Sequence, residues 1–145
     1  MNVRLSIVIR RDLEMSPGLL AAQACHMNDD WLRRRLRLQL VKGKLPKVAE
    51  GQSADYRVTM TPAQSQWCAG PVLSILAVNI PEELEELKKK AKDVGVEFWV
   101  WRDTIPSKVL GTPDKPRYLE VDVGLAFGPD DDEKIKQVTG GLPLY

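Results

Sequence analysis

The chain has 145 residues, of which 43% are hydrophobic and 28% charged, and its formal net charge is +1. This length favours a single domain over residues 1–145 with its own core. A nearly balanced charge gives no global reason to expect a nucleic-acid or membrane partner, so any such argument must rest on local clustering. Two cysteines and one histidine exclude a disulfide framework and a standard zinc site, and we expect no metal and no cofactor. No apolar run is as long as the roughly 20 residues of a spanning helix, and no signal peptide is recognisable. We therefore expect a cytoplasmic protein without a membrane partner.

The first half of the chain predicts one strand and one long helix. The short β-branched run at 3–9 is typical of a strand. A helix is expected to begin at Pro17, where Ser16 can act as the N-cap, and to continue to about Val41. Residues 42–70 show no clean period, so we expect an irregular insertion that is either functional or contains a short element. The expected buried stripe of the long helix comprises Leu20, Ala24, Met27 and Trp31.

The second half alternates strands with helices, which indicates an α/β layered sheet. Acidic residues early and lysines late, followed by Gly95, favour a helix that begins at Pro81. Prolines and a glycine predict a loop over residues 103–117. The predicted elements, in chain order, are a strand at 71–80 buried on both faces, a helix at 81–94, a strand at 96–101, the loop, a strand at 118–127, a short helix at 128–140 and an apolar tail that packs back.

Polar side chains in two of these elements are candidates for a site. Leu19, Gln23 and His26 share one face of the first helix, because residues three and four apart are neighbours. A single histidine near a core is more often structural than catalytic. Asp103 follows the apolar strand at 96–101, and ligands of α/β sheets bind beyond the carboxyl ends of strands. An aspartate in a loop also commonly caps a turn, so both interpretations of Asp103 stay open.

Two further features have an ordinary and a functional interpretation. The predicted loop carries the hydroxyls of Thr104, Ser107 and Thr112, but no base is adjacent in sequence to mark a nucleophile. Residues 31–47, which we call the basic stretch, hold seven cations and no acid. The stretch is either a solvated helix face or a phosphate-binding surface. Its cations are Arg33, Arg34, Arg35, Arg37, Lys42, Lys44 and Lys47.

Three segments in the same order resemble the type II peptidyl-tRNA hydrolases. "MSPGLLAAQACH" is similar to that family's motif at the start of its first helix, M-S-x-G-K-x-A-A-Q-x-x-H. Residues 70–103 resemble its central strand, helix and strand ending in Arg-Asp, and residues 121–145 resemble its final strand, Gly-Pro turn and closing helix. The resemblance implies a mixed four-stranded sheet flanked by helices, a homodimer, and metal-free hydrolysis of the ester between a peptide and tRNA.

The resemblance also implies roles for individual residues. Gln23, His26 and Asp103 match family positions, Ser107 falls where the family has a threonine, and Thr112 with Gly111 matches a Gly-Thr pair. Asp103 would orient or deprotonate water, Ser107 and Thr112 would bind the ester carbonyl or ribose, and Gln23 and His26 would support the site. The tRNA backbone would be bound by the basic stretch, through Arg33, Arg34, Arg37, Lys42 and Lys44.

One departure from the family keeps alternatives open. The family carries a lysine directly after the motif glycine, facing the catalytic aspartate, and this chain has Leu19 there. Leucine can neither balance a carboxylate nor favour negative charge that develops in a transition state. Lys108, next to Ser107, is a candidate substitute. The alternatives to an attenuated hydrolase are a non-catalytic tRNA- or RNA-binding protein on the same fold and a hydrolase of another acyl ester or amide.

Overall fold

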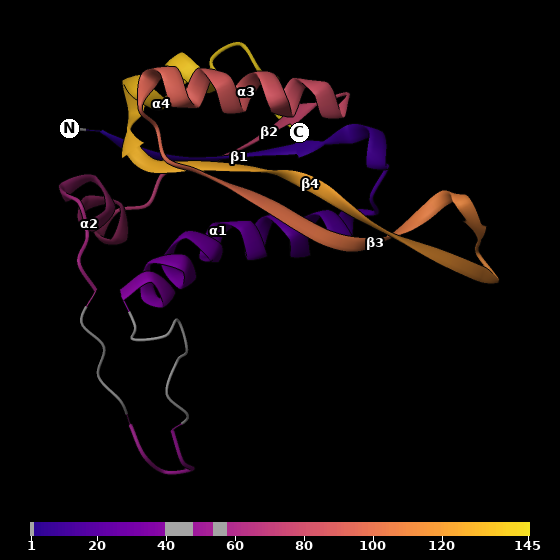
Figure 1. Ribbon diagram of the computed structural model, residues 1–145, viewed down its shortest axis with the longest axis horizontal. Coiled ribbons are helices and arrows are strands. Elements are labelled where there is room, and N and C mark those ends of the chain that lie inside the picture. The colour runs from indigo at the N-terminus through magenta and orange to yellow at the C-terminus, as the bar shows by residue number, and fades with distance from the viewer. Residues whose placement is uncertain (1, 40–47, 54–57) are drawn as a thin grey trace.

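The computed structural model describes residues 2–39, 48–53 and 58–145, without the side chains of residues 37–39, 108 and 109. The described strands form one mixed sheet of order β2-β1-β4-β3, in which β1 and β2 are parallel and β4 is antiparallel to both of its neighbours. In Figure 1, α1 covers one face of this sheet and α3 and α4 cover the other. The predicted α/β fold with a four-stranded sheet is confirmed. The elements are β1 (Val3–Arg10), the short 3₁₀ helix η1 (Arg11–Leu13), α1 (Pro17–Gln39), α2 (Pro62–Ala69), β2 (Leu73–Val78), α3 (Pro81–Val94), β3 (Phe98–Thr112), β4 (Lys115–Asp131) and α4 (Asp132–Thr139).

The sheet separates two hydrophobic layers, because successive side chains of a strand point to opposite faces. Val8 of β1 lies in the layer under α3 and α4, whereas Ile7 and Ile9 lie in the layer under α1. The predicted buried stripe of α1 is confirmed at Ala24, Met27 and Trp31, and Leu20 is half-buried. Each fully buried valine, leucine, isoleucine, phenylalanine or methionine side chain contributes about 1.5–3 kcal/mol to the free energy of unfolding. Both layers therefore hold the central strands in place from opposite sides.

A short helix, α2, lies within the segment predicted as an irregular insertion. Its start is a reciprocal capping box: the Gln64 backbone N–H donates to Thr61 Oγ1 at 3.2 Å, and the Thr61 N–H donates to Gln64 Oε1 at 3.1 Å. The Thr-x-x-Gln spacing with a proline at the first helical position is the sequence signal for this helix. Residues 42–47 and 54–57 of the same segment lie outside the described part of the chain.

The prediction of a loop over residues 103–117 is wrong. β3 continues to Thr112 and β4 begins at Lys115, so the two strands form a long hairpin with its turn at 113–114. Ile105 pairs with Leu119, and Pro106 with Tyr118. Proline is tolerated there because β3 is an edge strand, where a missing N–H costs no ladder hydrogen bond. Figure 1 shows this hairpin extending beyond the helices.

The strand predicted at 71–80 is buried on both faces only in its second half, where the successive residues Leu76, Ala77 and Val78 are buried. β2 is the other edge strand, and Leu73 at its start is 42% exposed. The chain end runs beside it: the Ala77 N–H donates to the Pro143 carbonyl at 2.9 Å, and the Tyr145 N–H donates to the Ile75 carbonyl at 3.1 Å. The predicted packing of the apolar tail is therefore confirmed. Among the described helices, none has the length and apolar character needed to cross a membrane.

An ion-pair cluster ties β1 to the start of α4. The Asp132 carboxylate accepts hydrogen bonds from Arg4 of β1 and from Lys136 one turn later in α4, the latter at 2.8 Å. The Lys136 and Arg4 hydrogen bonds hold the pKa of Asp132 below its ordinary value of 3.8. A carboxylate whose pKa is lowered by folding stabilises the fold above its unfolded-state pKa, and this stabilisation is lost as the pH falls through the folded-state pKa.

We predict that Asp132→Asn lowers the free energy of unfolding at pH 7 and that the deficit shrinks as the pH falls below about 4. The reason is that the wild-type carboxylate becomes protonated there and loses the same interactions. Urea unfolding at several pH values measures this difference. Glu86→Gln, which removes an exposed carboxylate from the middle of α3, is the matched control. A deficit that stays constant down to pH 2 contradicts the prediction.

Candidate functional site

Alternate residues of β3 bring the candidate acid to the face covered by α1. Trp99 and Trp101 pack against the hydrophobic layer under α1, and Ile105 is buried in it. Asp103 lies between Trp101 and Ile105 in this alternation, so its side chain shares that face. Asp103 thus lies inside a long strand rather than just after a short one. The pairing register shifts between Trp101 and Arg102, at an irregularity that leaves the alternation on β3 intact.

A buried amide connects α1 to this face. Gln23 is only 2% exposed, and its Nε2 donates to Asp103 Oδ2 at 2.8 Å. Its Oε1 accepts a hydrogen bond from Trp101 Nε1 at 2.6 Å. Because an indole N–H can only donate, it fixes which end of the amide faces the carboxylate. The other carboxylate oxygen of Asp103 accepts the backbone N–H of Thr104 at 2.7 Å. The half-buried Asp103 is therefore held by neutral donors on both oxygens.

His26 joins the site through its ring. The imidazole is exposed and stacks on the indole of Trp101, with ring centroids 5.5 Å apart and planes inclined by 19°. Trp101 was not among the residues predicted from the sequence, although it orients Gln23 and supports His26. Its position two residues before Asp103 on a strand is the one signal that could have indicated it. The structure therefore brings three predicted residues, Gln23, His26 and Asp103, together around an unpredicted one.

The two predicted hydroxyl residues lie farther along the hairpin. Ser107 is on the same strand face as Asp103 but four residues away, which corresponds to about 13 Å between Cα atoms. Its Oγ accepts the Leu110 N–H at 3.1 Å, and Thr112 Oγ1 accepts the Lys115 N–H at 3.2 Å. Both hydroxyls thus shape the end of the hairpin. The side chain of Lys108 lies outside the described part of the chain.

Leu19, which stands where the resemblance predicts a lysine, lies one helical turn before Gln23. Leu19 is half-buried and packs against the layer that contains Ile7, Ile105 and Met27. Its backbone N–H donates to Ser16 Oγ at 3.3 Å, which agrees with the predicted N-cap. The site therefore combines a carboxylate held by neutral groups with an apolar side chain on the neighbouring helical turn.

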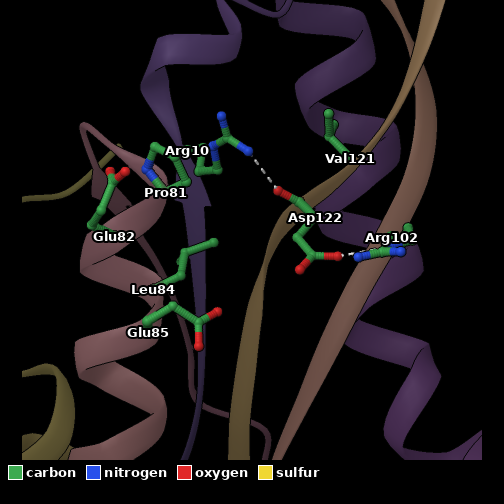
Figure 2. Close-up of a pocket in the computed structure, with 8 residues that line it drawn as sticks. All are labelled: Arg10, Pro81, Glu82, Leu84, Glu85, Arg102, Val121 and Asp122. Atoms are coloured by element: carbon green, nitrogen blue, oxygen red, sulfur yellow. Dashed lines mark hydrogen bonds and ion pairs between the residues drawn. The ribbon is translucent and has the colours of Figure 1, made fainter.

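The Arg-Asp end of the apolar motif divides between the two faces of the sheet. Arg102 points to the face opposite Asp103, where its Nε donates to Asp122 Oδ1 at 2.7 Å. Figure 2 shows this pair beside Arg10, whose Nη1 donates to the Asp122 carbonyl at 3.2 Å, at a cavity of about 260 Å³ next to α3. The hydrogen bond and charge of Asp122 raise the pKa of Arg102. Arg102 is thus paired away from the candidate site.

A family model and several known proteins match most of the length of this chain. A family model described as "Peptidyl-tRNA hydrolase PTH2" matches residues 3–145. The chain belongs to this family. It is 30% identical over 142 residues to the peptidyl-tRNA hydrolase of Methanothermobacter thermautotrophicus, covering 95% of this chain and 96% of that protein. It is also 30% identical over 141 residues to that of Haloquadratum walsbyi, with 97% of each chain covered, and 33% identical over 114 residues to that of Nanoarchaeum equitans, with 75% and 92% covered.

The peptidyl-tRNA hydrolase family match also spans the basic stretch, where the structure separates two kinds of arginine. Arg33 is exposed. Arg34 is held internally: its guanidinium pairs with Asp30 at 2.5 Å, donates to the Val100 carbonyl at 3.1 Å and lies 5.2 Å from the ring centroid of Trp99. Arg35 pairs with Glu97 at 3.1 Å. The side chains of Arg37, Lys42, Lys44 and Lys47 lie outside the described part of the chain.

Within the described residues, no group of three or more His, Cys, Asp or Glu side chains is placed to hold a metal ion. The family membership and the geometry around Gln23 together define the candidate site: one oriented carboxylate, an amide, an indole and an imidazole on the α1 side of the hairpin.

Proposed function

We propose that this chain hydrolyses the ester bond between a peptide and tRNA at the face around Asp103. The observation that carries the proposal is the hydrogen-bonded sequence from Trp101 through Gln23 to Asp103, with bonds of 2.6 and 2.8 Å. An arrangement that orients a carboxylate with neutral donors leaves its charge free for chemistry, whereas a carboxylate that only caps a turn needs no buried amide behind it. Membership of the peptidyl-tRNA hydrolase family supports the same activity.

In this proposal Asp103 acts as a general base. Each of its oxygens has accepted one protein hydrogen bond, so lone pairs remain for a water molecule. The carboxylate takes a proton from that water as its oxygen attacks the ester carbonyl. The carbon–oxygen bond to the ribose then breaks, and the ribose oxygen leaves with the proton that Asp103 took from water, which returns Asp103 to its carboxylate form. The products are a peptide with a free carboxyl group and tRNA with a free hydroxyl.

The surrounding side chains position this base. Gln23 fixes the carboxylate, Trp101 fixes Gln23, and His26 covers one face of the indole. Ser107 and Thr112 lie farther along the hairpin than the ester at Asp103, and they are proposed to contact the ribose end of a substrate that extends along β3. We also propose a cytoplasmic homodimer, for which sedimentation equilibrium is the direct test.

A second candidate function follows from Leu19. With an apolar side chain at the family's lysine position, a protein that binds tRNA or another RNA without turning over the ester is the alternative. Both functions use the same surface, and they differ only in whether the ester is cleaved.

Asp103→Asn keeps the size of the side chain but removes the charge. We expect cleavage of N-acetylated aminoacyl-tRNA to fall by about 10²- to 10⁴-fold, the usual contribution of a general base, with a much smaller change in melting temperature. Asp122→Asn is the control, because it removes a carboxylate from the opposite face of the same strand pair, and we expect this variant to keep its activity. Full activity of Asp103→Asn in a folded protein contradicts the assignment of the base.

Leu19→Lys restores the family's charge at a half-buried position. We expect faster single-turnover cleavage, because an ammonium near Asp103 can stabilise negative charge that develops on the ester. The matched control is Leu20→Lys, which places the same charge about 100° around the helix. Equal acceleration by both variants indicates general attraction of tRNA instead. If the wild type and Leu19→Lys both fold and bind tRNA but neither cleaves it, the RNA-binding alternative holds.

The basic stretch is proposed to contact the tRNA backbone through its exposed cations. We expect Arg33→Ala to weaken tRNA binding and to reduce the slope of log affinity against log salt by about one, the effect of losing one phosphate contact. Arg34→Ala is the comparison: it should lower stability, because it leaves the buried Asp30 without its partner. Filter binding at several salt concentrations and thermal unfolding separate the two. An unchanged affinity and slope for Arg33→Ala contradicts the proposal.

A further inference from the structure

A cavity of about 480 Å³ lies beside the Asp103 face, between η1 and the β3–β4 hairpin, and we call it the hairpin cavity. We propose that it binds the side chain of the amino acid esterified to tRNA and that it favours large apolar side chains. The inference rests on the proposed hydrolysis and adds the substrate class that the site selects. Its apolar lining consists of Leu13, Ile105, Pro106, Leu110 and Leu119.

The position of the cavity follows from the strand that carries Asp103. Ile105 is the next residue on the same face of β3, about 6.6 Å further along the strand. Leu119 pairs with Ile105 in the register of the hairpin, so the two side chains lie together on that face. An amino acid whose ester carbonyl lies at Asp103 can therefore reach the cavity with its own side chain. The distance from the ester carbonyl to the cavity is within the length of one amino-acid side chain.

The chemistry of the lining selects an apolar group. Leu110 is 51% exposed and Leu119 is 43% exposed, so both present apolar surface to the cavity that a ligand can remove from water. The volume lies in the range of about 300–1,000 Å³ that is usual for small-molecule sites. Three polar residues, Ser107, Asp12 and Glu14, complete the lining.

Hydrogen bonds and an ion pair hold the wall opposite the hairpin. Arg10 neutralises Asp12 with hydrogen bonds of 3.0 and 2.6 Å. The Glu14 N–H closes η1 by donating to the Arg11 carbonyl at 3.0 Å, and the Arg11 guanidinium donates to the Leu144 carbonyl at 2.5 Å. A preformed wall lowers the entropy that binding would cost. The cavity can therefore bind a side chain without first rearranging this wall.

The test uses one tRNA sequence charged with N-acetyl-phenylalanine or with N-acetyl-glycine, so that the two substrates differ only in the side chain. We expect kcat/KM to be about tenfold or more higher for the phenylalanine substrate, as hydrophobic pockets usually discriminate. Leu119→Ala should lower this ratio by about fourfold or more. Leu110→Asp should lower it as well and serves as a second variant if the first does not fold. Leu73→Ala is the matched control, because Leu73 is a strand leucine with nearly the same exposure, 42% against 43%.

Four outcomes overturn the inference. A wild-type ratio near one, with both substrates cleaved, shows that the cavity does not select the side chain while the proposed hydrolysis stands. An unchanged ratio in both folded cavity variants has the same meaning. A wild-type dimer that Leu110→Asp converts to a monomer, with the ratio unaltered, assigns the cavity to contact with a second copy of the chain. If neither substrate is cleaved, the proposed function fails first and the inference fails with it.

Discussion

The buried amide of Gln23 is the constraint on which the site depends. A group that is 2% exposed must satisfy both its donor and its acceptor, and a missing partner costs about 1–3 kcal/mol. Here the amide oxygen accepts a hydrogen bond from the Trp101 indole, and the amide nitrogen donates one to the Asp103 carboxylate. Both partners lie on one face of β3. A neutral amide offers a donor and an acceptor side by side in one side chain, without a charge. Gln23 therefore fixes the rotation of α1 against the hairpin and, in the same contact, the orientation of the candidate base.

The sequence predicts the parts of this fold that local patterns determine. β1, the start of α1 and the Gly95 end of α3 follow from β-branched runs, caps and the helix dipole, and the structure agrees with each of them. The hairpin could not be predicted in the same way, because whether Pro106 is tolerated depends on β3 being at the edge of the sheet, and strand order is not a local property. The role of Trp101 was hidden for a related reason: its partner is Gln23, 78 positions away in the chain.

Strand alternation explains how two adjacent charged residues come to serve different purposes. Arg102 is paired with Asp122 on the α3 side, and Asp103 is held by Gln23 on the α1 side. If the two charges shared a face, Arg102 could pair with the Asp103 carboxylate and compete with Gln23 for it. Because successive side chains of a strand point to opposite faces of the sheet, the arginine lies on the other face from the adjacent aspartate. The basic stretch shows the same division, since Arg34 is held by Asp30 and Val100 whereas Arg33 is exposed.

Leu19 gives the site a different electrostatic balance from one that holds a lysine. The carboxylate of Asp103 is supported by an amide and a backbone N–H, so its negative charge is oriented but not cancelled. In the proposed hydrolysis that charge would favour removal of a proton from water and would oppose the build-up of negative charge on the ester oxygen nearby. The two effects offset each other as the proton moves, because the carboxylate becomes neutral while the oxyanion forms. Under this proposal the site could work without the lysine, and binding of the substrate in the hairpin cavity, which Ile105 and Leu119 line, would then contribute more.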